Sequence, residues 1–331
     1  MVRLPASHDL DCLVRAPGFV LGNWPTPLEC LDTELGPIWV KRDDLSGFGR
    51  GGVKTRKIEH LIDYVAPRGY REVITVVANI TNLAHDIGPA VARAGIRSTV
   101  FAVDEPSIPA ASRTEFFRGA DAGVALLGTS QVLAAAHLAY AAARSSARGR
   151  RTFVALPSLS HPSALVGAAR GFLEMVLQFR EAGSYPEVVF ITVASGATYA
   201  GFLLAERALA AAGLPPIQVI GVQVHQHRAR VWIAGLMRWS KWSLGLSTPA
   251  SRIELIDSAL HGGFGRFSRE IVDTCHDVQK RHGLRIDPIF GGKTWTVMER
   301  WLADKRPRGP VVYWHCGYTP DWESMGVLCR R

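Results

Sequence analysis

Residues 51–59 read Gly51-Gly52-Val53-Lys54-Thr55-Arg56-Lys57-Ile58-Glu59, two adjacent glycines followed by a lysine and the first turns of an expected helix. The glycines allow a tight bend, so that Lys54 lies at the start of that helix. Because the N-terminal end of a helix is electropositive, a lysine there loses its proton more readily and becomes an amine nucleophile. An exposed first turn decorated by Lys54, Arg56 and Lys57 is an equally good interpretation of this segment alone.

Expected strands and helices alternate on both sides of this stretch. Strands are expected over residues 37–41, 72–77, 98–103, 188–193, 216–222 and 310–315. Helices are expected over residues 55–64, 86–94, 131–143 and 162–181, and again from Ala200 onward. This alternation predicts an α/β fold with open, mainly parallel twisted sheets flanked by helices. The arginine-rich residues 144–151 are expected to form an exposed connection.

The composition indicates a globular protein with a sizeable core. The chain has 331 residues, of which 47% are hydrophobic, and a formal net charge of +9. Its arginines are scattered and are not interleaved with stacking aromatic residues, so we expect no nucleic-acid partner. The five cysteines form an odd set without metal-ligand spacing, which argues against a disulfide framework or a metal site and favours the cytoplasm.

Residues 188–205 contain no charged side chain, and these 18 residues approach the length of a membrane span. The stretch changes character midway, however, from a β-branched run to small residues and then to a helical pattern. A buried strand, a turn and a helix therefore explain it better, and we expect no membrane partner. The N-terminus reaches Asp9 and Asp11 before any apolar region develops, so we expect no signal peptide in this stretch.

Two further strand-to-helix turns carry polar residues. Thr81 and Asn82 follow the expected strand at residues 72–77 and could either cap the next helix or present a hydroxyl and an amide to a ligand. Residues 195–201, Ser-Gly-Ala-Thr-Tyr-Ala-Gly, follow the strand at 188–193. Small residues there let backbone N–H groups converge on a phosphate or carboxylate, or simply let a helix pack closely on a sheet.

Taken together, these segments resemble the fold-type II pyridoxal-phosphate enzymes, in the branch that contains D-cysteine desulfhydrase and 1-aminocyclopropane-1-carboxylate deaminase. The resemblance spans most of the chain. The order and spacing of the matching segments make the resemblance specific. These segments are residues 26–29, 40–44, 51–59, 195–201, 287–293 and 315–317.

The resemblance implies a role for each matching residue. Lys54 would form the Schiff base with pyridoxal 5'-phosphate, and Asn82 would bond the ring hydroxyl of the cofactor. Thr81 stands where the branch has a serine near the substrate. Cys316 stands where a threonine faces the pyridine nitrogen, and a thiol is a weak donor that favours elimination or replacement over transamination. The phosphate would be held by Ser195, Gly196, Ala197 and Thr198.

The chain also departs from the pattern of this branch. Val53 replaces an asparagine and Leu83 a common histidine, whereas Phe264 and Phe290 replace two tyrosines of the substrate pocket. The phenylalanines keep the rings but remove hydroxyl groups that could exchange protons. D-cysteine desulfhydration and cyclopropane opening are therefore not expected, unless further residues take over those roles, such as Thr81, His85, His161 or Tyr318.

The resulting hypothesis is a lyase or transferase that catalyses β-elimination or β-replacement on a small-molecule amino acid. A γ-replacement or a cyclopropane-forming or -opening reaction is the runner-up. The sequence also leaves open a cofactor-binding protein without catalysis, or a phosphosugar- or nucleotide-binding protein without this cofactor. Residues 1–55 and 165–331 are expected to form a large cofactor-binding domain and residues 56–164 a small domain, in a homodimer.

Overall fold

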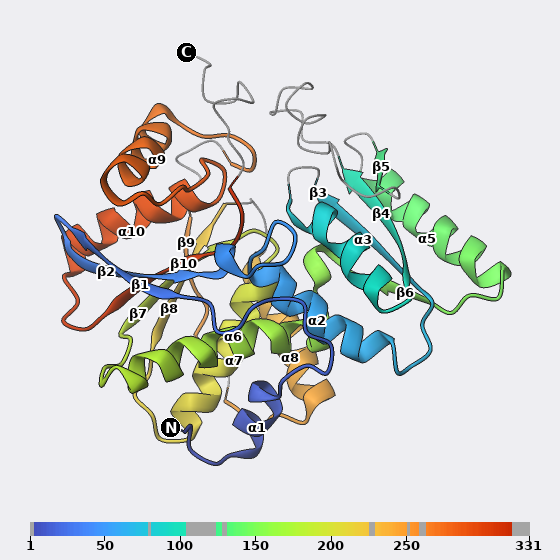
Figure 1. The fold of residues 1–331 in the computed structure, drawn as a ribbon, viewed down its shortest axis with the longest axis horizontal. Coiled ribbons are helices and arrows are strands. Elements are labelled where there is room, and N and C mark those ends of the chain that lie inside the picture. The colour runs from blue at the N-terminus through green and yellow to red at the C-terminus, as the bar shows by residue number, and fades with distance from the viewer. Residues whose placement is uncertain are drawn as a thin grey trace.

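The computed structural model describes residues 3–78, 81–103, 124–127, 131–224, 229–249, 252–257 and 263–319. Within these residues the strands form two sheets (Figure 1). The larger sheet has the order β1-β2-β10-β7-β8-β9. Its strands are β1 (Leu28–Thr33), β2 (Gly36–Arg42), β7 (Val188–Val193), β8 (Gln218–Gln223), β9 (Glu254–Asp257) and β10 (Val311–His315). The smaller sheet has the order β5-β4-β3-β6. Its strands are β3 (Glu72–Ala78), β4 (Arg97–Val103), β5 (Val124–Leu127) and β6 (Thr152–Ala155).

Strand direction confirms the predicted α/β class. Every pair of neighbouring strands is parallel except β1 and β2, which form an antiparallel edge. Parallel strands place their carboxyl ends at the same edge of a sheet, where loops and helix N-termini gather ligands. The ends of β2, β10 and β7 therefore lie side by side, and these ends carry the turns that the sequence singled out.

Helices cover both faces of the larger sheet (Figure 1). The helices against one face are α1 (His8–Val14), α6 (Pro162–Glu181), α7 (Ala197–Ala211) and α8 (Ala229–Leu244), and those against the other are α9 (Arg269–His282) and α10 (Gly291–Lys305). In β7, Val189 and Ile191 pack into the first layer and Val188 and Phe190 into the second. A strand buried on both faces reads as a continuous apolar run, which explains the charge-free residues 188–193.

The smaller sheet packs against α2 (Val53–Val65) and α3 (Leu83–Arg93), while α5 (Gln131–Ala147) contacts its strands as well. One expectation changes in part. Residues 144–147 continue α5, in which Ser145 is buried and donates a hydrogen bond to Glu72, whereas residues 148–151 form the mostly exposed connection to β6. The strands of the smaller sheet lie between residues 72 and 155, but the domain boundaries at 55/56 and 164/165 stay predictions. In the described residues no helix combines the length and the apolarity that crossing a membrane requires.

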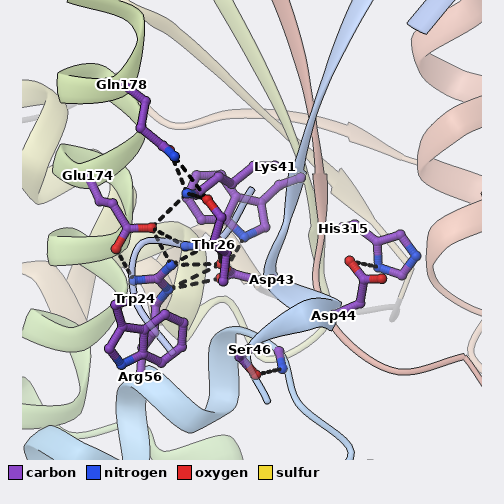
Figure 2. Close-up of polar contacts among 12 residues, drawn as sticks. Trp24, Thr26, Lys41, Asp43, Asp44, Ser46, Arg56, Glu174, Gln178 and His315 are labelled. Carbon is purple, nitrogen blue, oxygen red and sulfur yellow. Dashed lines mark hydrogen bonds and ion pairs between the residues drawn. The ribbon is translucent and has the colours of Figure 1, made fainter. Parts of the chain in front are cut away.

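A buried polar network ties α2 to the larger sheet (Figure 2). The Arg56 guanidinium, 1% exposed, donates to Asp43 Oδ1 at 2.8 Å and to Glu174 Oε1 at 2.8 Å. Lys41 Nζ reaches the same Glu174 Oε1 at 2.6 Å and Gln178 Oε1 at 2.6 Å. The interpretation of Arg56 and Lys57 as an exposed first turn is therefore wrong, because both side chains are 1% exposed.

We predict that Glu174→Gln destabilises the protein by about 3 kcal/mol at neutral pH, because it leaves the Arg56 and Lys41 charges under-compensated. Burial alone raises the pKa of Glu174, but the hydrogen bonds and charges of Arg56 and Lys41 overcome this and lower the pKa to about 2. This stabilisation is present above the ordinary carboxyl pKa of ~4.3 and is lost as pH falls toward 2. Urea unfolding at pH 7 and pH 3 measures it.

The matched control is Asp273→Asn, which removes the exposed ion pair between Arg269 and Asp273, at 2.8 Å. Such pairs contribute less than ~1 kcal/mol. Equal losses of unfolding free energy in the two variants, or a loss for Glu174→Gln that does not shrink in acid, would contradict the role of the network.

Candidate active site

Lys54 lies where α2 meets the carboxyl end of β10. The helix begins at Val53, and its N-cap is Gly52 with φ of +106°. A Cβ on Gly52 would lie 2.1 Å from the carbonyl oxygen of Cys316, and the Val53 N–H donates to that same oxygen at 3.0 Å. The second glycine of the turn is thus required by a close approach of two backbones, and this approach brings Lys54 and Cys316 together.

Burial shifts the pKa of both side chains of this pair in the direction of their neutral forms. It lowers the pKa of Lys54, against the opposing charges of Cys316, Asp86 and Asp287. Burial also raises the pKa of Cys316 to about 12, although the Lys54 charge acts in the other direction. The amine is thereby shifted toward the form that attacks a carbonyl, and the thiol stays protonated near neutral pH.

The turn before α3 joins the same region from the smaller sheet. Asn82 stands at the N-cap of α3 but makes no capping hydrogen bond with its side chain. Its Nδ2 instead donates to the Tyr318 carbonyl at 2.8 Å, and the Tyr318 N–H donates to the Arg50 carbonyl at 3.0 Å. Asn82 and Thr81 are both half-buried, and their predicted contacts with cofactor and substrate stay predictions.

The turn after β7 has the geometry of an anion site. Gly196 is the N-cap of α7, with φ of +83° and no capping hydrogen bond from a side chain. Ser195 Oγ accepts from the Ala197 N–H at 3.5 Å, and Thr198 is half-buried in the first helical turn. The N-terminus of a 15-residue helix therefore offers backbone donors beside two hydroxyl groups.

The structure also brings the two substituted phenylalanines together. The rings of Phe264 and Phe290 meet edge to face, with centroids 5.7 Å apart. The Phe290 N–H donates to Asp287 Oδ1 at 2.7 Å, and the Asp287 charge acts on both Lys54 and Cys316. The apolar pair is thus attached to a turn that borders the lysine.

Two carboxyl groups in this region were not predicted from the sequence, the buried Asp86 and the half-buried Asp287. Asp287 accepts hydrogen bonds from three successive N–H groups, those of Ile289, Phe290 and Gly291. An aspartate just before a proline gives a weak turn signal that could have identified it. Nothing in the sequence near Asp86 indicates its neighbours, since they come from residues 49–54.

His161, by contrast, occupies a structural position. Its ring packs edge-on against Phe153 and Trp239, and Nδ1 lies 2.8 Å from Ser163 Oγ at the start of α6. Burial lowers its pKa to about 4, so that it stays neutral.

A model of the family of pyridoxal-phosphate dependent enzymes matches residues 20–317. The chain belongs to this family. The predicted family, cofactor and enzymatic nature are thereby confirmed, and the hypotheses of a protein without this cofactor and of one without catalysis are set aside.

Similar proteins agree with this assignment. A protein of Pyrococcus abyssi named for 1-aminocyclopropane-1-carboxylate deaminase is 28% identical over 317 residues, which cover 93% of each chain. D-cysteine desulfhydrase of Salmonella typhi is 27% identical, with 96% of this chain and 97% of that protein covered. The crystal structure of an ACC deaminase homologue has a TM-score of 0.83 at 23% identity and covers 98% of this chain and 99% of its own, a likeness that bears on the fold.

The residues of this pyridoxal-phosphate enzyme fit the cofactor that defines the family. The cofactor has an aldehyde, which requires an amine nucleophile, and a phosphate dianion, which requires backbone donors. Burial shifts Lys54 toward the free amine, and the start of α7 supplies the donors. Lys54 is therefore the residue that would carry the cofactor, with the phosphate at residues 195–198.

We predict that Ser195→Ala and Thr198→Val each weaken binding of pyridoxal phosphate about 10-fold or more. A hydrogen bond to a charged group contributes ~1.5–3 kcal/mol, and each variant removes one hydroxyl donor without changing the backbone. Gly196 is a poor test position, because its φ is +83° and a Cβ there would meet Ile233 Cγ1 at 2.5 Å.

Fluorescence titration of the apoprotein measures the dissociation constants. Thr33→Val, which removes a hydroxyl bonded to the Gly36 carbonyl in the turn between β1 and β2, serves as the control and leaves the constant unchanged. Wild-type affinity in both Ser195→Ala and Thr198→Val would show that the phosphate lies elsewhere.

Proposed function

We propose that the protein catalyses β-elimination or β-replacement on an amino acid, and not the reactions for which its relatives are named. The observation that carries this proposal is the edge-to-face pair of Phe264 and Phe290, with centroids 5.7 Å apart beside the turn of Asp287. Both rings lack the hydroxyl that a tyrosine would bring to the pocket.

Lys54 has two tasks in this proposal. Its amine first holds the cofactor, and then, once free, removes or returns the proton at Cα of the substrate. Attack on the cofactor and removal of the Cα proton need the neutral amine, which the lowered pKa of Lys54 supports, and the proton taken from Cα is the one that Lys54 can return. Pyridoxal phosphate, when bound, accepts the electron pair that the departing Cα proton leaves behind. Thr81, half-buried at the end of the smaller sheet, is the proposed contact for the substrate.

Cys316 directs the reaction type. Its thiol is protonated because burial raises the pKa to about 12, and its Sγ lies 3.6 Å from the Trp314 carbonyl oxygen. A neutral thiol is a weak donor to a ring nitrogen. Weak donation supports elimination or replacement over transamination, since transamination depends more heavily on electron withdrawal into the ring.

A second candidate is γ-replacement or a reaction that opens or forms a cyclopropane ring. It is favoured by the P. abyssi relative named for 1-aminocyclopropane-1-carboxylate deaminase, which is 28% identical to this chain. The phenylalanine pair argues against this candidate, because opening a three-membered ring calls for proton transfers that a phenyl ring cannot perform.

We predict that the wild type releases ammonia and a 2-oxo acid from D-cysteine and from 1-aminocyclopropane-1-carboxylate only poorly. Each missing acid or base group is expected to cost about 10²–10⁴-fold in rate. Phe264→Tyr and Phe290→Tyr restore one hydroxyl each and are expected to raise these rates. Steady-state assays with both compounds provide the measurement.

Phe267→Tyr, on the same segment but half-buried against the apolar cluster that α9 and α10 form with the sheet, is the matched control and leaves the rates as they are. Efficient turnover of either compound by the wild type, with no gain from either tyrosine, would reject the role assigned to the phenylalanines.

We also propose that the enzyme is a cytoplasmic homodimer. The outer side of α8 exposes Val231 at 70%, Trp232 at 42% and Trp242 at 83%. Apolar clusters of this kind on a soluble protein mark contact surfaces. A second copy of the chain is the proposed occupant, and the molar mass in solution decides this.

A further inference from the structure

A buried aspartate lies against the glycine-rich loop that leads into Lys54. Asp86, in the first turn of α3, is 1% exposed, and its Oδ1 accepts the Arg50 N–H at 2.8 Å. Gly49 has φ of +54°, and a Cβ there would lie 2.3 Å from the same oxygen. Only a glycine permits the loop to approach the carboxyl group this closely. The approach comes just before the turn in which Gly52 and Val53 bring Lys54 to Cys316.

The second oxygen of this carboxyl group has no such neighbour. Asp86 Oδ2 is buried, and no donor in the described parts of the chain reaches it. A buried carboxyl oxygen without a donor loses hydration and gains nothing in return, so native proteins rarely keep one without a use. Its use is indicated by the charges around it, because Asp86 and Lys54 act on each other electrostatically.

We propose that Asp86 is a positioning residue for Lys54. The carboxylate of Asp86 stabilises the proton on the Lys54 nitrogen. This charge would favour the protonated nitrogen while the cofactor is attached, and again when Lys54 has taken the proton from Cα. The second part rests on the proposed function, whereas the first needs no substrate. Asp86 acts through Lys54 and not on the reacting carbon.

The pKa of Asp86 determines the pH above which its side chain carries a negative charge. Burial raises its pKa to about 6, although the Arg50 N–H and the charges of Lys54 and Arg50 oppose this. Besides these groups, the titratable neighbours in the same region are His85 on α3 and Tyr318, whose ring lies 5.5 Å from the Arg50 guanidinium. Above about pH 6 the carboxylate form is therefore available to Lys54.

The test uses the cofactor-loaded protein without substrate. Pyridoxal phosphate linked to a protonated lysine nitrogen has a visible absorption band, and raising the pH removes that proton and the band. Asp86→Asn keeps the shape of the side chain and an oxygen for the Arg50 N–H, but removes the charge. We expect the pH midpoint of the band to fall by about one unit, since an opposite charge in proximity shifts a pKa by roughly 1–3 units.

The matched control is Asp63→Asn, which removes the same charge from the last turns of α2, where Asp63 accepts from the Gly18 and Phe19 N–H groups. Its midpoint is expected to stay at the wild-type value. A midpoint in Asp86→Asn that is unchanged, or that moves to higher pH, overturns the proposal without touching the reaction proposed above.

A second variant covers the case in which Asp86→Asn does not fold. Asp86→Ser removes the same charge with a smaller side chain, so its pH midpoint is also expected to fall by about one unit. A midpoint in Asp86→Ser that stays at the wild-type value also overturns the proposal.

Discussion

The placement of Lys54 depends on the burial of Arg56 between Asp43 and Glu174. A guanidinium with 1% exposure must have its charge and donors matched, and this requirement fixes α2 against the end of β2 on one side and α6 on the other (Figure 2). Residues two apart on a helix point in nearly opposite directions. Anchoring Arg56 in the core therefore turns Lys54 toward the carboxyl ends of β10 and β7.

Three loops complete the arrangement through hydrogen bonds in which at least one partner is a backbone group. The Cys316 carbonyl accepts from Val53, the Tyr318 carbonyl accepts from Asn82, and the Arg50 N–H donates to Asp86. The first of these contacts lies within the elements of the larger sheet and α2, and the other two reach the helix that follows β3 of the smaller sheet. The site is thus assembled between the elements of the two sheets, from segments far apart in the sequence.

Local patterns were sufficient to predict the architecture and the lysine turn. The β-branched run at residues 188–193, the helical pattern after Gly51-Gly52 and the small residues at 195–201 each reflect local backbone requirements, and the structure forms a strand, a helix start and a helix N-terminus there. The edge strand β1 was not expected, because its half-buried residues show neither a continuous apolar run nor a regular alternation.

Local sequence patterns do not predict interactions between residues that are far apart in the sequence. The side chains of Arg56 and Lys57 read as solvated charges, since their burial depends on Glu174 and on the Ser158 carbonyl, more than 100 residues away in sequence. Asp86 stands at the start of an expected helix, where an acidic residue is common, and only the fold reveals that Gly49 and Arg50 cover it. The roles of Thr81, Asn82 and Cys316 toward cofactor and substrate stay predictions.

The central claim is that Lys54, and no other lysine, carries the cofactor. Lys57 is the strict comparison, because burial lowers its pKa to about 7 and it lies one turn along the same helix, but its Nζ is engaged by the Ser158 carbonyl. Borohydride reduction of the loaded protein, followed by peptide mapping, measures the attachment directly. We expect a pyridoxyl group on Lys54 alone. A label on Lys57, or an unlabelled Lys54 in a protein that retains the cofactor, would contradict this claim.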